Sequence, residues 1–443
     1  MPAYRVASHL APASPDSSPR PCGSLAFAHA PLQSTDEAGD RLMSARCLLG
    51  TKRYCKLLIA QVVSGSGDWF ATVALLALVY EISGSAVAVG GMLALRLMPG
   101  AVAGPIAAKL AHRWDRRRTM VAMDFARAGI VMAVPMVRSL AWVLGWVFAM
   151  EMATLIYLPA RDASTRDLVD TDDDLPVANG LLMGGSYGTL PISAGIFAAY
   201  TAGPQLTSLP GGQLAPAFWI DAATFLFSGF VIATLKSLSN RIDSPELTGR
   251  LRDALQIPLV RSAIFPVVTA SLGLGTVFSL GIAFITGTLG AGDSQFAIFV
   301  LLFGVGAVIG VGTLQLLKPD DYVLEMWRGM LTLGAVLALM GIAPKLWLAY
   351  LAAVAFGTAS AYAIDAAVSG LQVRLDEERR VLAFTVFHIG LRVSLGVGAV
   401  LAGALADILG KAGVLDPIRI VMFGAGLVVL VATLPTRDRL GDR

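Results

Sequence analysis

The run LLIAQVVSGSGDWFATVALLALVY, residues 57–80, decides the class of this protein. It carries one charged side chain, Asp68, over a length that can cross a bilayer, because a membrane-spanning helix needs about 20 predominantly apolar residues. The whole chain of 443 residues has the same bias, with 56% hydrophobic and 15% charged residues. In soluble domains about 45–50% of the residues are hydrophobic and about 25% are charged. The composition therefore predicts an all-α polytopic membrane protein.

Apolar runs separated by polar breaks predict twelve transmembrane helices in two six-helix halves. The expected spans are residues 57–80, 86–110, 119–137, 140–160, 177–202 and 216–236, then 262–289, 295–317, 327–343, 346–371, 381–408 and 417–434. Polar sequence between the sixth and seventh spans divides the chain. The predicted organisation is a disordered, Pro- and Ser-rich cytoplasmic tail (1–50), the first half (51–236), a cytoplasmic linker (237–261), the second half (262–435) and a C-terminal tail (436–443).

Lys and Arg are concentrated in alternate loops between these spans. The densest is AHRWDRRRTM, residues 111–120, between the second and third spans. The loops on the opposite side hold only Arg138, Lys345, Lys411 and Arg419. Because cytoplasmic loops carry the excess of basic residues, we expect a multi-pass protein of the plasma or inner membrane with both termini in the cytoplasm.

The two halves share a weak internal repeat. TRDLVDTDDDLPVANG (165–180) follows the fourth span, and QVRLDEERRVLAF (372–384) follows the tenth. Each has an Arg, an acidic cluster and then a new helix, whose positive N-terminus favours the acids. Repeated halves joined by a polar linker are typical of secondary transporters, which bind their substrate between the halves.

Several stretches resemble the major facilitator superfamily. They are residues 67–90 (GDWFATVALLALVYEISGSAVAVG), 96–128 (RLMPGAVAGPIAAKLAHRWDRRRTMVAMDFARA), 157–169 (YLPARDASTRDLV) and 218–229 (FWIDAATFLFSG). Within that family the chain is similar to bacterial drug and siderophore exporters, such as enterobactin and macrolide efflux proteins. The resemblance implies alternating access by two six-helix halves, with small molecules and protons as partners. We expect a monomer in the lipid bilayer, with no cofactor and no nucleic acid.

The resemblance assigns a gating role to the loop after the second span. The family pattern Gly-x-x-x-Asp-Arg-x-x-Arg-Arg has Ala108 and His112 in the Gly and Asp places here, while Arg113, Asp115, Arg116 and Arg117 remain. Asp124 and Arg127, three residues apart on one helix face, are expected to brace this loop. In the fifth span, Pro191 and Gly195 match the antiporter pattern, and Leu190 replaces its Gly.

Charged side chains inside the spans are the candidate site. Such charges cost roughly 2.5–3.5 kcal/mol on insertion scales and usually face a cavity or a partner. The candidates are Asp68, Arg96, Glu151, Asp365 and Arg392. In the family, spans one, four, seven and ten line the central cavity, which places the three acids there and the two arginines beside them. Glu151 is the expected proton-coupling group and Asp68 the next candidate.

Each of these assignments has a structural alternative. Asp68 and Arg96 can form an ion pair that only holds neighbouring helices together, and Asp365 can serve as a gate or in packing. Asp221, near the start of the sixth span, is expected to cap that helix. The three cysteines, Cys22, Cys47 and Cys55, are expected to be reduced.

The sequence argues against an enzyme. It has no glycine-rich loop followed by Gly-Lys-Ser/Thr, no cluster of metal ligands and no nucleophile–base set. The leading interpretation is proton-coupled efflux of an amphipathic small molecule such as a drug, siderophore or secondary metabolite. The alternatives are a lysophospholipid or other lipid transporter, and a membrane receptor or regulator that no longer transports.

Overall fold

The computed structural model describes residues 36–111, 115–169, 174–203, 212–235, 255–317, 319–375 and 377–434. Within these ranges all regular elements are helices. Ten of the described helical segments are long and apolar enough to cross a membrane, and two shorter apolar segments, Ala86–Gly100 and Pro417–Thr433, complete the set. The twelve agree one by one with the predicted spans, so the predicted fold class is confirmed.

Most span boundaries lie within a few residues of the expected ones. The first half contains α2 (Lys52–Ser83), α3 (Ala86–Ala111), α4 (Arg116–Ala133) with the short turn η1 (Val134–Met136), α5 (Leu140–Arg166), α6 (Leu175–Tyr187), α7 (Leu190–Ala202) and α8 (Ala215–Ala233). The second half contains α10 (Pro258–Ile282) with the π-helical turn η3 (Ala283–Thr288), α11 (Asp293–Leu317), α12 (Tyr322–Gly341), α13 (Leu346–Arg374), α14 (Glu377–Lys411) and α15 (Pro417–Thr433).

The fifth span consists of two helices, α6 and α7, where a single helix was expected. The first ends at Gly188, whose N–H donates to the carbonyl of Gly184 at 2.8 Å. The second has Pro191 in its first turn, a position that tolerates proline because the first N–H groups of a helix have no partner within it. Inside a continuous helix the same proline would remove a backbone hydrogen bond, and a new helix begins at this point instead.

The expectation of a disordered tail over residues 1–50 is wrong for its last part. Residues Asp36–Gly50 form helix α1, and residues 1–35 lie outside the described ranges. Buried Leu48 joins Tyr54 and Leu57 in an apolar cluster, which provides the packing that stabilises this helix. Cys55 is a free thiol, whereas Cys47 is disulfide-bonded, so the expectation of reduced cysteines does not hold for Cys47.

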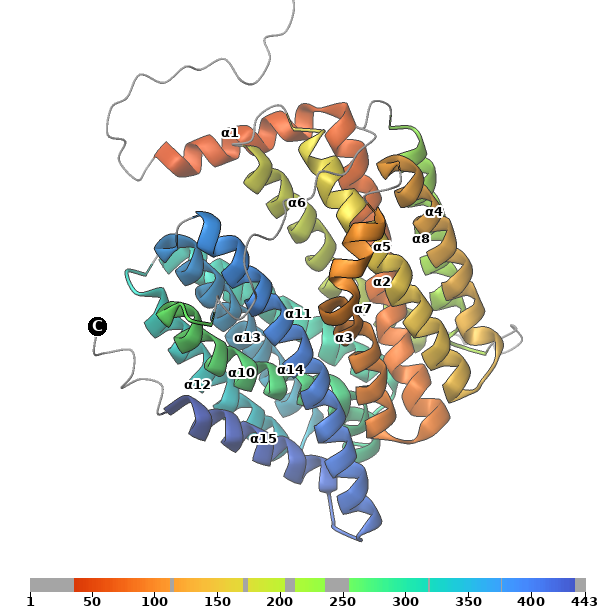
Figure 1. Ribbon diagram of the computed structural model, residues 1–443. Coiled ribbons are helices and arrows are strands. Elements are labelled where there is room, and N and C mark those ends of the chain that lie inside the picture. Colours follow the sequence, from red (N-terminus) through yellow and green to blue (C-terminus); the bar gives the residue numbers. More distant parts are fainter. Residues whose placement is uncertain are drawn as a thin grey trace, which may run out of the picture.

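The helices form two bundles that meet along two helix pairs (Figure 1). In the first bundle, α2 packs on α8, α4 packs on α5 and α8, and α3 packs on α5. In the second, α10 packs on α14, α11 packs on α13, and α12 packs on α13 and α15. Between the bundles, α3 packs on α14 and α7 packs on α11.

The α3–α14 contact is close because glycines stand at its crossing points. A Cβ on Gly90 would lie 2.3 Å from the carbonyl oxygen of Ala399, and one on Gly403 would lie 2.5 Å from that of Ala86. Larger side chains at these positions would force the backbones apart. Small residues have this role wherever membrane helices approach each other closely.

A carboxylate of the second bundle caps a helix of the first. Asp407, on α14, accepts hydrogen bonds from the hydroxyl of Ser85 at 2.5 Å and from the backbone N–H groups of Ala86 at 3.2 Å and Val87 at 3.3 Å. These are the first groups of α3, where the helix dipole favours negative charge. The contact closes the molecule at the end that carries the α2–α3 turn, which we call the closed end.

Toward α1 the bundles diverge (Figure 1). Along α3 and α14, the glycine contacts run from Ala86 at the closed end to Gly100, which faces Arg392. Along α7 and α11 they include Gly195 facing Leu301 and Gly304 facing Pro191. The structure is therefore one conformation of a two-bundle protein, held together at the closed end and apart at the α1 end.

Replacing Asp407 by Ala should open the closed end more often. Loss of a carboxylate at a helix N-terminus costs about 1 kcal/mol, or about a fivefold change in an equilibrium. A cysteine at position 279, where the Ser279 hydroxyl donates to the carbonyl of Ala86 at 3.0 Å, would report the opening. In a background without the native cysteines, its labelling by a membrane-impermeant maleimide should accelerate about fivefold. Asp293→Ala removes an acid from the first turn of α11 and should leave labelling unchanged; equal labelling in both variants would contradict this role.

Candidate functional site

Asp68 on α2 and Arg96 on α3 form an ion pair inside the first bundle. Arg96 Nη2 donates to both carboxylate oxygens of Asp68, at 3.0 and 3.2 Å. Its Nη1 donates to the hydroxyl of Thr72 at 2.5 Å, and that hydroxyl donates to the backbone carbonyl of Asp68 at 2.6 Å. The guanidinium is thus fixed by two residues one helical turn apart, and it holds α3 against α2.

Glu151 on α5 lies where the two bundles meet. Arg96 of its own bundle and Arg392 of α14 are the cationic groups that act on it electrostatically. Gly100 of α3 leaves the space between them: a Cβ there would lie 3.0 Å from Arg392 Nη1 and 4.0 Å from Glu151 Oε1. The structure therefore brings Glu151 and Arg392, far apart in the sequence, to the same point of the bundle contact.

Asp221 on α8 is a third carboxylate of this region. The expectation that it caps its helix is wrong, because α8 begins at Ala215 and places Asp221 in the second turn, where 1% of the residue is exposed. Its Oδ1 accepts a hydrogen bond from Thr224 at 3.3 Å, and its Oδ2 has no hydrogen-bond partner. A Cβ on Gly67 would lie 2.6 Å from Oδ1, so the carboxyl group lies against the backbone of α2.

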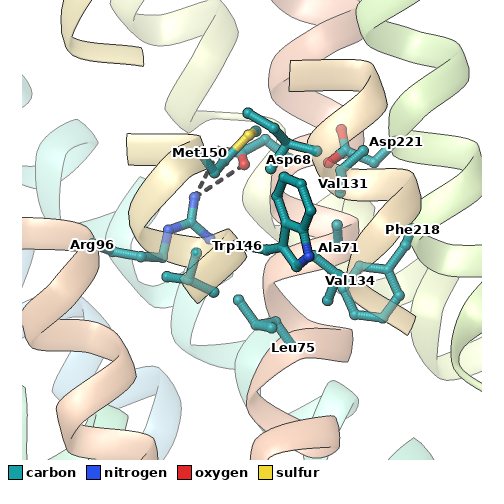
Figure 2. A pocket seen from close by; sticks show the side chains of 12 residues that line it. Asp68, Ala71, Leu75, Arg96, Val131, Val134, Trp146, Met150, Phe218 and Asp221 are labelled. Atoms are coloured by element: carbon teal, nitrogen blue, oxygen red, sulfur yellow. Dashed lines mark hydrogen bonds and ion pairs between the residues drawn. The ribbon is translucent and has the colours of Figure 1, made fainter. Parts of the chain in front are cut away.

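A small cavity lies between Asp68, Arg96 and Asp221 (Figure 2). Asp68, Arg96 and Asp221 are its charged lining residues, and the rest of the lining is apolar, including Trp146 and Phe218. Its volume is about 30 Å³, which is room for one or two water molecules. Water molecules in the cavity can hydrate the charged groups, but the cavity is too small for an organic substrate.

Asp365 lies apart from this cluster, in the second bundle. It accepts a hydrogen bond from Gln315 Nε2 at 3.0 Å, which links α13 to α11 near the end of α11. This contact agrees with the packing interpretation of Asp365. Of the five charged candidates, the structure brings together Asp68, Arg96, Glu151 and Arg392, and it leaves Asp365 outside.

The gating-loop candidates bind the first bundle's own helices. Asp115 caps α4 by accepting from the N–H of Arg118 at 2.8 Å. Arg116 donates to Asp167 at 2.6 Å, and Arg117 donates to the carbonyl of Leu235 at 3.1 Å. His112 and Arg113 lie outside the described residues.

Asp124 and Arg127 belong to the bundle core rather than to the gating loop. They bind each other, and Asp124 also accepts from the Ser228 hydroxyl at 2.8 Å. The guanidinium of Arg127 lies 4.1 Å from the ring centroid of Tyr157 and 4.4 Å from that of Phe225. The i, i+3 spacing places both side chains on the face of α4 that packs on α5 and α8. That they also brace the loop stays a prediction, because residues 112–114 lie outside the described ranges.

This arrangement defines a class of protein. Two helical bundles in contact along α3–α14 and α7–α11, with charges gathered at their junction, are the architecture of a membrane transporter rather than of an enzyme. Residues 57–319, more than half of the chain, match the Major Facilitator Superfamily. The chain belongs to this family and is a multi-pass membrane transporter, and transporters of this family carry small molecules.

Relatives and solved structures agree with this membership. The chain is 23% identical over 408 residues to the uncharacterized MFS-type transporter YvqJ of Bacillus subtilis (strain 168), with 87% of this chain and 93% of that protein covered. It is 23% identical over 292 residues to YfiS, another uncharacterized MFS-type transporter of that organism, with coverage of 63% and 67%.

Two crystal structures share the fold at low identity. The nucleoside transporter NupG has a TM-score of 0.72 at 10% identity, with 88% of this chain and all 100% of that chain covered. A bacterial homologue of the human lysosomal transporter Spinster, in an inward-facing and unoccupied conformation, has a TM-score of 0.70 at 14% identity, with coverage of 88% and 99%.

Replacing Arg127 by Met should destabilise the first bundle strongly. The change leaves the buried carboxylate of Asp124 without its counter-ion, and breaking a buried pair in this way costs about 3–5 kcal/mol. Thermal unfolding of the detergent-purified protein should show a midpoint several degrees lower. The double variant with Asp124→Asn should recover part of the loss, because it removes the orphaned charge. Arg118→Met, at an exposed position of the same helix, should have little effect; an Arg127→Met protein as stable as wild type would show that the pair is dispensable.

Proposed function

We propose that this transporter is a secondary active, proton-coupled exporter of amphipathic small molecules in the plasma or inner membrane. The Lys and Arg asymmetry of the loops supports an orientation with both termini in the cytoplasm. In that orientation the closed end faces outward, and the conformation described here is open to the cytoplasm. A cytoplasmic substrate would enter from the α1 end and leave when the closed end opens.

The observation that carries this proposal is the place of Glu151 between arginines of both bundles. When Glu151 is ionised, it attracts Arg96 of the first bundle and Arg392 of the second. A proton on Glu151 removes its charge and weakens the attraction to α14. Protonation therefore changes how strongly the bundles are held together at this point, and this is the link that coupled transport requires.

The distribution of charge favours a cationic amphipathic substrate. The candidate acids, Glu151 and Asp68, lie on helices of the first bundle. In the second bundle, α10 has no Asp, Glu, Lys or Arg beyond Arg261 in its first turn. The first-bundle side of the central cavity would therefore provide negative charge, and α10 an apolar surface opposite it. An ionised Glu151 can bind either a proton or a substrate cation, and this competition would link export to proton entry.

Glu151→Gln should abolish gradient-driven export and spare exchange. Glutamine keeps the size and hydrogen bonding of the neutral side chain but cannot carry a proton. In everted vesicles with an imposed proton gradient, ethidium, a catecholate siderophore and a macrolide would serve as test compounds. The wild-type protein should accumulate at least one of them in an uncoupler-sensitive manner, and Glu151→Gln should not. Counterflow of the same compound at saturating concentration should persist, because exchange needs no proton, while its half-saturating concentration rises with the loss of the charge on Glu151.

Asp365→Asn is the matched control, because it also neutralises an acid in a span but lies away from the bundle junction. It should retain gradient-driven accumulation. Full accumulation by Glu151→Gln would show that another group couples transport. Accumulation without any gradient dependence would instead favour a lipid or passive transporter, and no transport of any compound would favour the receptor interpretation.

A further inference from the structure

We propose that Asp68 and Asp221 share one proton, forming a second proton-binding site within the first bundle. The site extends the proposed function, because it is separate from Glu151 and pairs Asp68 with Asp221, a carboxylate expected only to cap its helix. It rests on three observations: the balance of charges around the cavity, the Oδ2 atom of Asp221 that has no hydrogen-bond partner, and the size and lining of the cavity between the two carboxyl groups.

The charged groups of the first bundle around the cavity and the bundle junction do not balance. Arg127 forms an ion pair with Asp124, and Arg96 forms one with Asp68. Glu151 has Arg392 of the second bundle beside it. Among the described residues, these are the cationic and anionic groups facing this region, and Asp221 is the carboxylate that has no cation of its own.

The surroundings of Asp221 disfavour an ionised carboxylate. The residue is almost completely buried, and its Oδ2 has no hydrogen-bond partner. An isolated buried charge of this kind is far more costly than a neutral group, and such sites take up a proton instead. Of the helices and turns packed against α8, α2 presents Asp68 here and Lys56 at the other end, where it binds Thr234. Helix α4 presents Arg127 together with its partner Asp124, and η1 presents no charged side chain.

Asp68 is the natural partner for that proton. It lies between Arg96 and Asp221 at one side of the cavity (Figure 2). Two carboxyl groups and one guanidinium carry an excess of one negative charge, and one shared proton cancels it. Carboxyl groups this close titrate as a pair rather than one by one, so the proton belongs to the site and not to either residue alone.

The cavity selects a proton over other cations. Its volume of about 30 Å³ admits one or two water molecules, and these can carry a proton between the two carboxyl groups. A metal ion would need several oxygen ligands, and no group of three or more His, Cys, Asp or Glu side chains that could hold one occurs among the described residues.

Pairing makes a specific prediction about single substitutions. If either carboxyl group is replaced by an amide, the other remains with Arg96 as a balanced ion pair and no longer needs the proton. Asp68→Asn and Asp221→Asn should therefore each remove the same proton. If Asp221 bound a proton independently, Asp68→Asn would leave that proton in place.

Infrared spectroscopy can detect the shared proton directly. The full-length protein would be purified in detergent with Glu151→Gln, so that Glu151 contributes no carboxyl signal. The C=O stretch of a protonated carboxyl, identified at neutral pH by its shift in deuterium oxide, should be present in this protein. It should be lost in the further variants Asp221→Asn and Asp68→Asn, and it should persist in Asp365→Asn.

Three results would overturn the proposal: no such band at neutral pH, a band that survives Asp221→Asn, or a band that survives Asp68→Asn. Gel filtration and thermal unfolding would verify that each variant is folded. If Asp221→Asn does not fold, Asp68→Asn still decides, because that side chain is 37% exposed and tolerates an amide more easily. The assay does not depend on transport, so failure of Glu151 as the coupling group would leave this result unaffected.

Discussion

An unpaired charge inside an apolar helix bundle is costly, and the interior of the first bundle is arranged around this constraint. Arg96 and Arg127 each have a carboxylate partner on their own or the neighbouring helix, and aromatic rings of Tyr157 and Phe225 cover Arg127. Each pair also binds a hydroxyl group, Thr72 or Ser228. These contacts join α2 to α3 and α4 to α8, so the charge pairs contribute to the helix packing of the whole bundle.

The two bundles differ in which charged side chains they provide at their junction, and this difference determines where the candidate site lies. Around the cavity and the bundle junction, the first bundle provides the acids Asp68, Glu151 and Asp221 and one arginine, Arg96, whereas the second contributes Arg392. Because Arg96 is already paired with Asp68, Glu151 depends on Arg392, across the bundle contact, for a further positive charge. A residue whose partner belongs to the other moving part is suited to coupling, because its charge state affects their relative position and not only the stability of one bundle.

The sequence predicted the helices well because the physical signal is local. A bilayer requires about 20 apolar residues in a row, and each span shows this over its own length. The intrahelical spacing of Asp124 and Arg127 also predicted their contact. The spacing could not show which way that face of the helix points, so it did not predict that Asp124 and Arg127 lie in the core of the bundle.

Long-range contacts left weaker signals in the sequence. Asp221 is expected to cap its helix because it lies near the start of the sixth span, but α8 begins at Ala215 and Asp221 is buried in its second turn. Asp407 lies near the end of an apolar span, and its partners Ser85, Ala86 and Val87 are more than 300 residues earlier. The burial of Asp221 could not be derived without knowing that α8 packs on α2, and the Asp407 contact could not be derived without knowing that α3 and α14 are neighbours.

Helix α14 connects these features into one device. It carries Asp407, which caps α3 at the closed end, and Arg392, which faces Glu151. Arg392 precedes Asp407 by fifteen residues, so the two lie about 22 Å apart along the helix at 1.5 Å per residue. The glycine contacts at Gly90 and Gly403 lie on the Asp407 side of Arg392 and keep the two helices close. Between the bundles, neutralising Glu151 weakens the attachment at Arg392, while the cap at Asp407 is unaffected by that proton. Opening the closed end must therefore break a contact that protonation of Glu151 does not itself release, and that step needs a further source of free energy, such as substrate binding between the bundles.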